Sequence, residues 1–143
     1  MSNAESLVRA YYHAFNSGDR AAFLALLADD VAHDISQGRR ESGRDTFARF
    51  MAHMDRCYRE EITDLIVMTN PAGTHAAAEF TVHGTYLQTD PGVPAGTPPA
   101  AGQTYTLPAG AFFTLANGRI TRIANHYNLG EWVRQVGGCY QPL

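Results

Sequence analysis

The stretch FNSGDRAAFLALLADDV, residues 15–31, contains the signals that decide the fold of this chain. Gly18 can take the left-handed conformation that ends a helix, and Asp19 directly after it is a favoured residue for starting another. Apolar residues recur at helical spacing on both sides of this pair. The stretch therefore predicts one helix from about residue 4 to residue 16 and a second helix over residues 20–28.

Residues outside this stretch extend the pattern in both directions. Ser2 and Glu5 have the spacing of a capping box at the start of the first helix. The acidic pair at 29–30 ends the second helix, and a short strand is predicted over residues 31–36. Ser42 then caps a third helix. The apolar stripe of this third helix consists of Phe47, Phe50, Met51, Met54 and Tyr58.

From residue 61 onwards the sequence has the composition of strands and turns. The predicted strands cover residues 61–69, 74–88, 104–115 and 119–129, and a short helix follows at 130–136. Asn-Gly at 117–118 is a strong hairpin signal between the last two strands. The Pro- and Gly-rich segment 89–103 is too long for a tight turn and is typical of a lid or binding loop. Three helices, one short strand and a four-strand antiparallel meander predict a single α+β domain over residues 1–143, with a pocket between helices and sheet.

Composition and charge exclude several classes of function. The 143 residues carry 11 basic and 14 acidic side chains, for a net charge of −3. All 11 basic residues are Arg, and the sequence contains no Lys. Without Lys, Schiff-base chemistry and the usual phosphate loop are excluded, and no basic patch indicates nucleic acid. No segment has the character of a signal peptide or membrane span, so we expect a cytoplasmic protein without a membrane partner.

The sequence contains no motif for a cofactor, a metal or a nucleophile. Cys57 and Cys139 belong to no CxxC pair and are expected to be reduced thiols. His13, His53 and His75 are lone histidines without metal-ligand spacing, and we expect them on the surface or satisfied by neighbours. No dinucleotide fingerprint and no GxSxG motif is present. Any chemistry is therefore expected to need neither cofactor nor metal.

Two adjacent polar residues, His33 and Asp34, interrupt the predicted strand 31–36. A strand sends neighbouring side chains to opposite faces, so one of them must point into the core. The alternation alone does not choose between them. An acid inside an apolar pocket has a raised pKa and can act as a general base near neutral pH.

A second polar alternation occurs in the strand AEFTVHGTY, residues 78–86. Glu79, Thr81 and His83 share one face, and apolar residues occupy the other. The polar face either meets solvent or lines the pocket. In the second case Glu79 and His83 would bind substrate or form an acid–base pair.

The order helix, GD, helix, ADD, strand, together with SGRD at the third helix and a late GRI hairpin, resembles the nuclear transport factor two-like superfamily. Within it the chain is similar to the ketosteroid-isomerase-related, SnoaL-like proteins, over nearly its whole length. The resemblance implies a cone-shaped α+β barrel, in which three N-terminal helices pack on a strongly curved, mostly antiparallel sheet that encloses a pocket. It also implies a homodimer formed through the outer face of the sheet.

The resemblance carries over some functional residues and not others. Tyr11 takes the position of the tyrosine on the first helix, which donates a hydrogen bond to a substrate oxygen. Asp34 takes the position of the general base when one residue is deleted from the alignment, and His33 is its competitor. The third group, a protonated acid in ketosteroid isomerase, falls at Gly110. The paired-donor oxyanion hole is therefore broken in this chain.

By the same resemblance the last strand presents Asn125 and Tyr127 to the cavity. Asn125 would bond a polar group of the substrate, while Glu79 and His83 would orient it or replace the missing donor. The candidate apolar walls are Phe47, Phe50, Phe112 and Tyr127.

These features predict a cofactor-free enzyme of isomerase or cyclase type that binds a hydrophobic small molecule. Asp34 would remove a proton next to a carbonyl, and Tyr11 would stabilise the enolate. One alternative is a non-catalytic small-molecule binding module, which the glycine at position 110 favours. Another is water activation, as in the epoxide hydrolases of the superfamily, which requires an Arg-linked carboxylate pair deep in the cavity.

Overall fold

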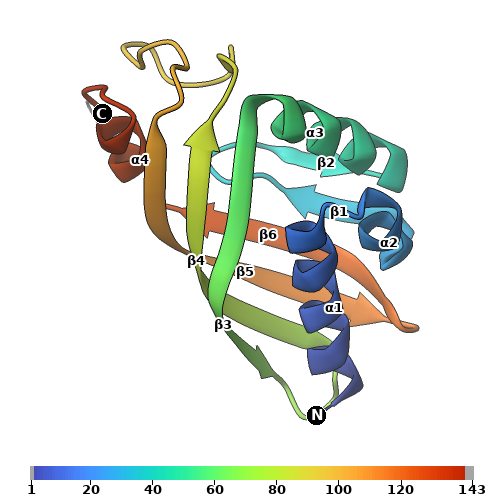
Figure 1. Cartoon of the computed structure of the whole chain (residues 1–143). Coiled ribbons are helices and arrows are strands. Elements are labelled where there is room, and N and C mark those ends of the chain that lie inside the picture. The colour runs from blue at the N-terminus through green and yellow to red at the C-terminus, as the bar shows by residue number, and fades with distance from the viewer. Residues whose placement is uncertain (1, 141–143) are drawn as a thin grey trace.

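A computed structural model describes residues 2–140 and shows α1, α2 and α3 on one side of a curved sheet (Figure 1). The helices are α1 (Asn3–Ser17), α2 (Arg20–Ala25), α3 (Arg44–Cys57) and α4 (Leu129–Gln135). The strands are β1 (Leu27–Asp34), β2 (Arg40–Ser42), β3 (Tyr58–Thr69), β4 (His75–Tyr86), β5 (Thr104–Ala116) and β6 (Arg119–Tyr127).

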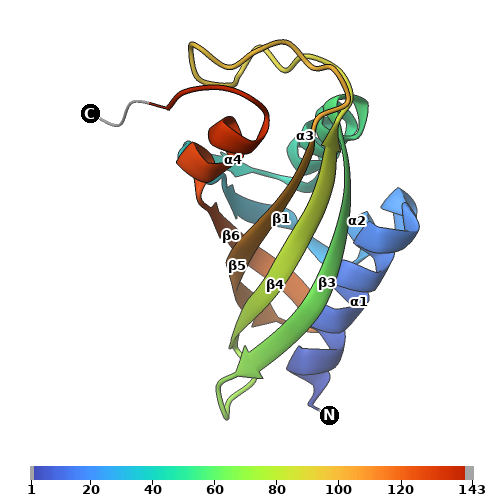
Figure 2. The ribbon, with the colours of Figure 1, turned by 60° about the vertical axis from the view of Figure 1, so that its left-hand side comes forward.

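The strands of the described residues form one six-stranded sheet in the order β2-β1-β6-β5-β4-β3. β1 and β6 are parallel, and all other neighbouring strands are antiparallel. The long strands β3, β4 and β5 bend so that the sheet curls around the space facing the helices (Figure 2). The predicted α+β fold with helices on a curved, mostly antiparallel sheet is confirmed.

The local signals that end and start these elements behave as the sequence predicts. Gly18 has a φ of 74° and ends α1 in the left-handed conformation. The side chains of Ser2 and Asp19 each accept a hydrogen bond from a backbone N–H in the first turn of the helix that follows. Asn117 and Gly118, with φ of 53° and 73°, form the turn between β5 and β6. Two successive positive φ angles are what a type I′ hairpin requires.

Several predicted boundaries are wrong: the first strand is Leu27–Asp34 instead of 31–36, and β3 already begins at Tyr58, which was predicted in the third helix. Strand pairing explains two further differences. The second helix ends at Ala25 instead of residue 28, because Leu27 is fully buried and pairs with Ile120 of β6. Ser42 does not cap the third helix, because it lies in β2 and pairs with β1. Gly43 takes the cap position without a side-chain hydrogen bond.

A bulge in β3 reverses the direction of the side chains that follow it. Between Thr63 and Ile66 this strand has one residue more than β4, and Asp64 has a φ of 57°. An extra residue shifts all later side chains to the opposite face. Ile62 is therefore 8% exposed and Ile66 is 52% exposed, although they stand four positions apart.

The core lies between α1 and the concave face of the sheet. Tyr11 and Tyr12 of α1 pack there against Phe23, Phe80 and Phe113. At one end of the sheet, the segment between β4 and β5 runs past α4 (Figure 2). None of the helices in residues 2–140 combines the length and apolar character needed to cross a bilayer.

Candidate functional site

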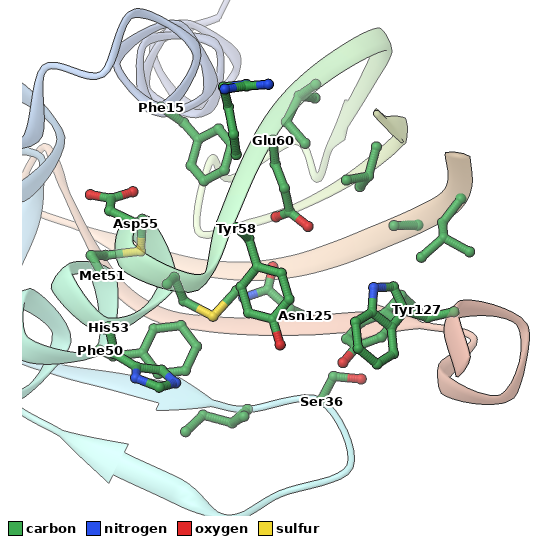
Figure 3. Close-up of a pocket in the computed structure, with 18 of the residues that line it drawn as sticks. Phe15, Ser36, Phe50, Met51, His53, Asp55, Tyr58, Glu60, Asn125 and Tyr127 are labelled. Carbon is green, nitrogen blue, oxygen red and sulfur yellow. The ribbon is translucent and has the colours of Figure 1, made fainter. Parts of the chain in front are cut away.

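A cavity of about 870 Å³ occupies the concave side of the sheet. Its walls come from α1, α3, α4 and the sheet (Figure 3). The segment between β4 and β5 also contributes to them. Its apolar lining includes Phe15, Phe47, Phe50, Met51, Phe80, Val82, Leu107 and Trp132. A mostly apolar cavity of this size with a few polar groups is typical of a small-molecule site.

His33, and not its neighbour Asp34, faces this cavity. The His33 ring is 2% exposed, stacks on Phe47 at a centroid distance of 4.2 Å, and meets Phe50 edge-on at 4.6 Å. Burial lowers the pKa of His33 from its usual 6.5 to about 4, against the smaller opposing effect of the Asp34 charge. The imidazole is therefore neutral at neutral pH.

Asp34 points to the other side of β1, where two arginines hold its carboxylate. Arg40 Nε and Nη2 donate to it at 2.6 and 3.0 Å, and Arg122 Nε donates at 2.9 Å. The hydrogen bonds from Arg40, followed by those from Arg122, outweigh desolvation and lower the pKa of Asp34 to about 2. The expectation that Asp34 faces the pocket with a raised pKa is wrong, because an ion pair outside the cavity satisfies the carboxylate.

Tyr11 lies at the α1 wall of the cavity, in the direction that the resemblance implies. Its ring contacts Phe23 and Phe113 with centroid distances of 4.5 and 5.5 Å, and the residue is 5% exposed. Burial raises the pKa of its hydroxyl, which Arg20 lowers only in part, so the hydroxyl keeps its proton. Tyr11 can therefore donate a hydrogen bond.

Three of the predicted substrate-binding residues lie outside the cavity. Glu79 and His83 occupy the exposed positions of β4, while the alternating apolar residues of that strand face inward. Phe112 is 53% exposed on β5 and meets the ring of His126 at 5.6 Å. The open question about the polar face of β4 is thus settled: that face meets solvent, because the inward positions are needed for the core.

The remaining predicted residues line the cavity. Asn125 and Tyr127 reach it from β6, and Phe50 reaches it from α3 (Figure 3). Phe47 of α3 lines it as well. Burial, with smaller contributions from nearby carboxylates, raises the pKa of Tyr127 to about 12.

Glu60, which was not among the predicted site residues, sends its carboxyl into the cavity from β3 (Figure 3). The Tyr105 hydroxyl donates a hydrogen bond to Glu60 Oε2 at 2.5 Å. Burial raises the pKa of Glu60, and the bond from Tyr105 opposes this only in part. Strand alternation contained the signal, because Glu60 shares a face with Tyr58 and Ile62.

Gly84 makes the contact between Glu60 and Tyr105 possible. Within the sheet Gly84 stands between them, paired with Glu60 on β3 and with Tyr105 on β5. A Cβ atom at position 84 would lie 2.1 Å from Cζ of Tyr105. The missing side chain therefore leaves the space in which the Tyr105 ring crosses β4 to reach Glu60.

The segment between β4 and β5 is attached to the cavity wall through Asp90. The carboxylate of Asp90 accepts hydrogen bonds from the Tyr58 hydroxyl at 2.7 Å and from Gly92 N at 2.9 Å, and His53 Nε2 lies 3.1 Å from it. Although burial raises the pKa of Asp90, these hydrogen bonds and the His53 charge outweigh it and hold the pKa below its usual range. His53 is therefore satisfied by a neighbouring side chain, which is one of the two situations that the sequence predicts for it.

Within residues 2–140, one group of side chains could hold a metal ion, namely His53, Cys57 and Asp90. One potential ligand atom from each lies within 4.8 Å of the other two. The Asp90 oxygens already accept hydrogen bonds from Tyr58 and Gly92. These contacts explain why the three side chains lie together: Asp90 attaches the segment between β4 and β5 to the cavity wall.

Comparisons with known proteins identify the family and the relatives of this fold. The family model for the SnoaL-like domain matches residues 8–123. A chain from Pseudomonas putida KT2440, described as a "putative polyketide cyclase", is 58% identical, with 96% of this chain and 99% of that chain covered and a TM-score of 0.89. A chain from Xanthomonas campestris with the same description is 53% identical, with 94% and 97% covered and a TM-score of 0.89. No curated protein matches the chain.

More distant solved structures share the fold alone. An epoxide hydrolase from M. tuberculosis, described as LEH-like, is 16% identical, with 94% of this chain and 84% of that chain covered and a TM-score of 0.69.

Proposed function

The chain belongs to the SnoaL-like domain family, and from this membership and the cavity we propose that it is a cofactor-free enzyme of cyclase or isomerase type. Its substrate would be a hydrophobic small molecule that carries a carbonyl group. Two relatives, each described as a "putative polyketide cyclase", at 58% and 53% identity, support this class of reaction. The aromatic lining of the cavity supports a hydrophobic substrate.

The observation that carries the proposal is the Glu60 carboxyl in an apolar cavity. Its raised pKa makes it a stronger base than an exposed carboxylate once it is ionised. The cavity side of Glu60 is where a substrate C–H bond could approach, and Tyr105 holds the carboxyl in position. Glu60 thus replaces Asp34 as the proposed general base.

In the proposed reaction Glu60 takes a proton from the carbon next to the carbonyl. The electron pair of that C–H bond moves onto the carbonyl oxygen and forms an enolate. Tyr11, which is protonated and lines the cavity, would donate a hydrogen bond to this oxygen. Asn125 would bond a second polar group of the substrate, while Phe50 and Tyr127 would form apolar walls.

Proton abstraction can be measured without the natural substrate, by following deuterium exchange into the acidic CH₂ group of β-tetralone in D₂O by NMR. The rate should rise with pH as Glu60 loses its proton, because only the carboxylate accepts one. Glu60→Gln should lower the catalysed rate by roughly 10²- to 10⁴-fold, the usual range for a general base.

Glu61→Gln is the matched control, because Glu61 is the next residue and is exposed on the opposite face of β3. It should leave exchange unchanged. Equal exchange by the wild-type and Glu60→Gln proteins would contradict the base assignment. Binding of β-tetralone without any exchange above buffer would favour the alternative of a non-catalytic binding module.

The epoxide-hydrolase alternative receives less support. Among the described residues, the Arg-linked carboxylates near the cavity are in the wrong places for it. Asp34, with Arg40 and Arg122, lies outside the cavity. Arg20 and Asp55 line the cavity as an ion pair, but their side chains are 28% and 42% exposed, so this pair belongs to the rim.

We also propose that the protein forms a homodimer through the outer face of the sheet. The exposed ring of Phe112 beside His126 supports an apolar contact there. Phe112→Ser should shift the mass measured by multi-angle light scattering from dimer to monomer. Thr106→Ser, at another exposed position of β5, is the control that should leave the mass unchanged. A wild-type protein that is monomeric at all concentrations would contradict this proposal.

A further inference from the structure

His33 is a polar residue that the proposed proton abstraction does not yet use. Its ring lies between Phe47 and Phe50, contacts both, and forms part of the cavity wall. A histidine placed in an aromatic wall at the cost of desolvation needs a reason, because a phenylalanine would pack there without that cost.

The two ring nitrogens of His33 have different surroundings. Nδ1 is sealed from solvent and has no hydrogen-bond partner among the described residues. Neutral imidazole has one N–H and one bare nitrogen, and a buried N–H without a partner is among the rarest groups in folded proteins. The bare nitrogen is therefore best assigned to Nδ1, so that the proton lies on Nε2.

We propose that His33 donates a hydrogen bond from Nε2 to the substrate oxygen that becomes negatively charged. The inference rests on the proposed enolate-forming reaction and adds a second donor to Tyr11. Ketosteroid isomerase has a protonated acid as its second donor on a late strand, whereas β5 of this chain contains no acidic residue. His33 would supply the donor that is missing there.

The charge balance of this arrangement suits a neutral imidazole. The C–H proton goes to Glu60, the electron pair goes to the oxygen, and the Nε2 proton stays on His33 throughout. A preorganised neutral donor in a mostly apolar cavity stabilises the oxyanion without first losing a charge of its own. The adjacent carboxylate of Asp34 is held by Arg40 and Arg122 on the opposite face of β1 and does not compete for this proton.

The tautomer is the first test, because it does not depend on turnover. ¹⁵N NMR on the wild-type protein, with the His33 signals assigned by their loss in His33→Gln, should show a proton on Nε2 and a bare Nδ1 at pH 7. Bound β-naphthol, whose hydroxyl mimics the enol, should shift the Nε2 signal. A proton on Nδ1, or a charged imidazolium at pH 7, would overturn the inference whether or not Glu60 is the base.

The second test compares variants in β-tetralone exchange. His33→Phe keeps the aromatic stack and removes the donor, so exchange should fall roughly 10²- to 10³-fold, as for loss of one oxyanion donor. His33→Gln keeps an N–H and should retain more activity than His33→Phe. His13→Gln, at an exposed position of α1, is the matched control.

The outcomes separate this inference from the base assignment. Exchange that is lost in Glu60→Gln and unchanged in both His33 variants would refute the donor role alone. Exchange unchanged in Glu60→Gln would refute the base, while the tautomer and the β-naphthol shift would still decide on His33. If His33→Phe does not fold, His33→Gln and the NMR measurements keep the inference open to refutation.

Discussion

On the inner face of β1, His33 is packed between aromatic rings and stays neutral, whereas on its outer face the adjacent Asp34 is fully ionised between two arginines. The same contrast separates the two acids of β3, since Glu60 faces the cavity with a raised pKa and Glu61 is exposed. Residue type alone therefore does not assign a base in this fold. The face on which a carboxyl lies sets its pKa. Arginines lower the pKa of Asp34 on the outer face, whereas burial in the cavity raises the pKa of Glu60.

The largest effect that tests this comparison concerns two isoleucines of one strand. Ile62→Ala should cost about 2–5 kcal/mol of unfolding free energy, because it leaves a cavity in the core. Ile66→Ala should change it by less than about 0.5 kcal/mol, because the bulge turns this side chain outward. Urea unfolding measures both, and similar losses would show that the bulge does not reverse the strand.

The acid stability of the protein should depend on His33. Its folded-state pKa of about 4 lies below the usual 6.5, so the unfolded chain binds a proton first as the pH falls. The stabilising contribution is present above pH 6.5 and is lost progressively toward pH 4, by about 3 kcal/mol in total. As the pH falls from 6.5 to 4, the unfolding free energy of the wild-type protein should therefore decrease more than that of His33→Phe. Urea unfolding at a series of pH values measures both. Equal losses would mean that His33 is charged or exposed when folded.

Gly84→Ala tests whether the space above position 84 is needed for Tyr105 to reach Glu60 on the inner face. The added methyl group overlaps the Tyr105 ring, so we expect a loss of about 1–3 kcal/mol and of the contact between Tyr105 and Glu60. In a Tyr105→Ala background the same change should cost much less, because the overlapping ring is absent. Urea unfolding of the four proteins measures this coupling. Additive losses would contradict the role given to Gly84.

The smallest effect is expected on the outer face of β1. Asp34→Asn should lower the unfolding free energy by less than about 1 kcal/mol, because the ion pairs it removes are partly exposed. β-Tetralone exchange should change by less than about twofold. A large loss of exchange would mean that Asp34 takes part in the reaction, and it would contradict the different roles given to the two faces of β1.

Short-range signals explain why much of the fold was predictable. Capping by Ser2 and Asp19, the left-handed Gly18 and the hairpin at Asn117 act over a few residues, so their geometry follows from local sequence. The prediction failed where a distant strand competes. Leu27 leaves the second helix because β6 pairs with it, and no local pattern contains that information.

The candidate site was predictable only in part. Tyr11, Asn125 and Tyr127 line the cavity as the family resemblance implies, and Phe50 lines it as a predicted apolar wall. Asp34, Glu79, His83 and Phe112 lie outside it, because in each case strand alternation left two faces open. Glu60 was missed although its alternation with Tyr58 and Ile62 placed it on the inner face.

Local sequence signals were enough to predict the α+β class, most helix and strand ends, and the set of polar residues available for chemistry. The tertiary structure alone decided which of these residues meet. The curvature of the sheet brings His33 of β1 and Glu60 of β3 to one cavity, although β6, β5 and β4 separate their strands. The space above Gly84 lets Tyr105 reach Glu60, and the bulge sets which later residues of β3 face inward. Pairing and curvature are long-range properties, set by packing against the whole core, and a local pattern of residues does not encode them.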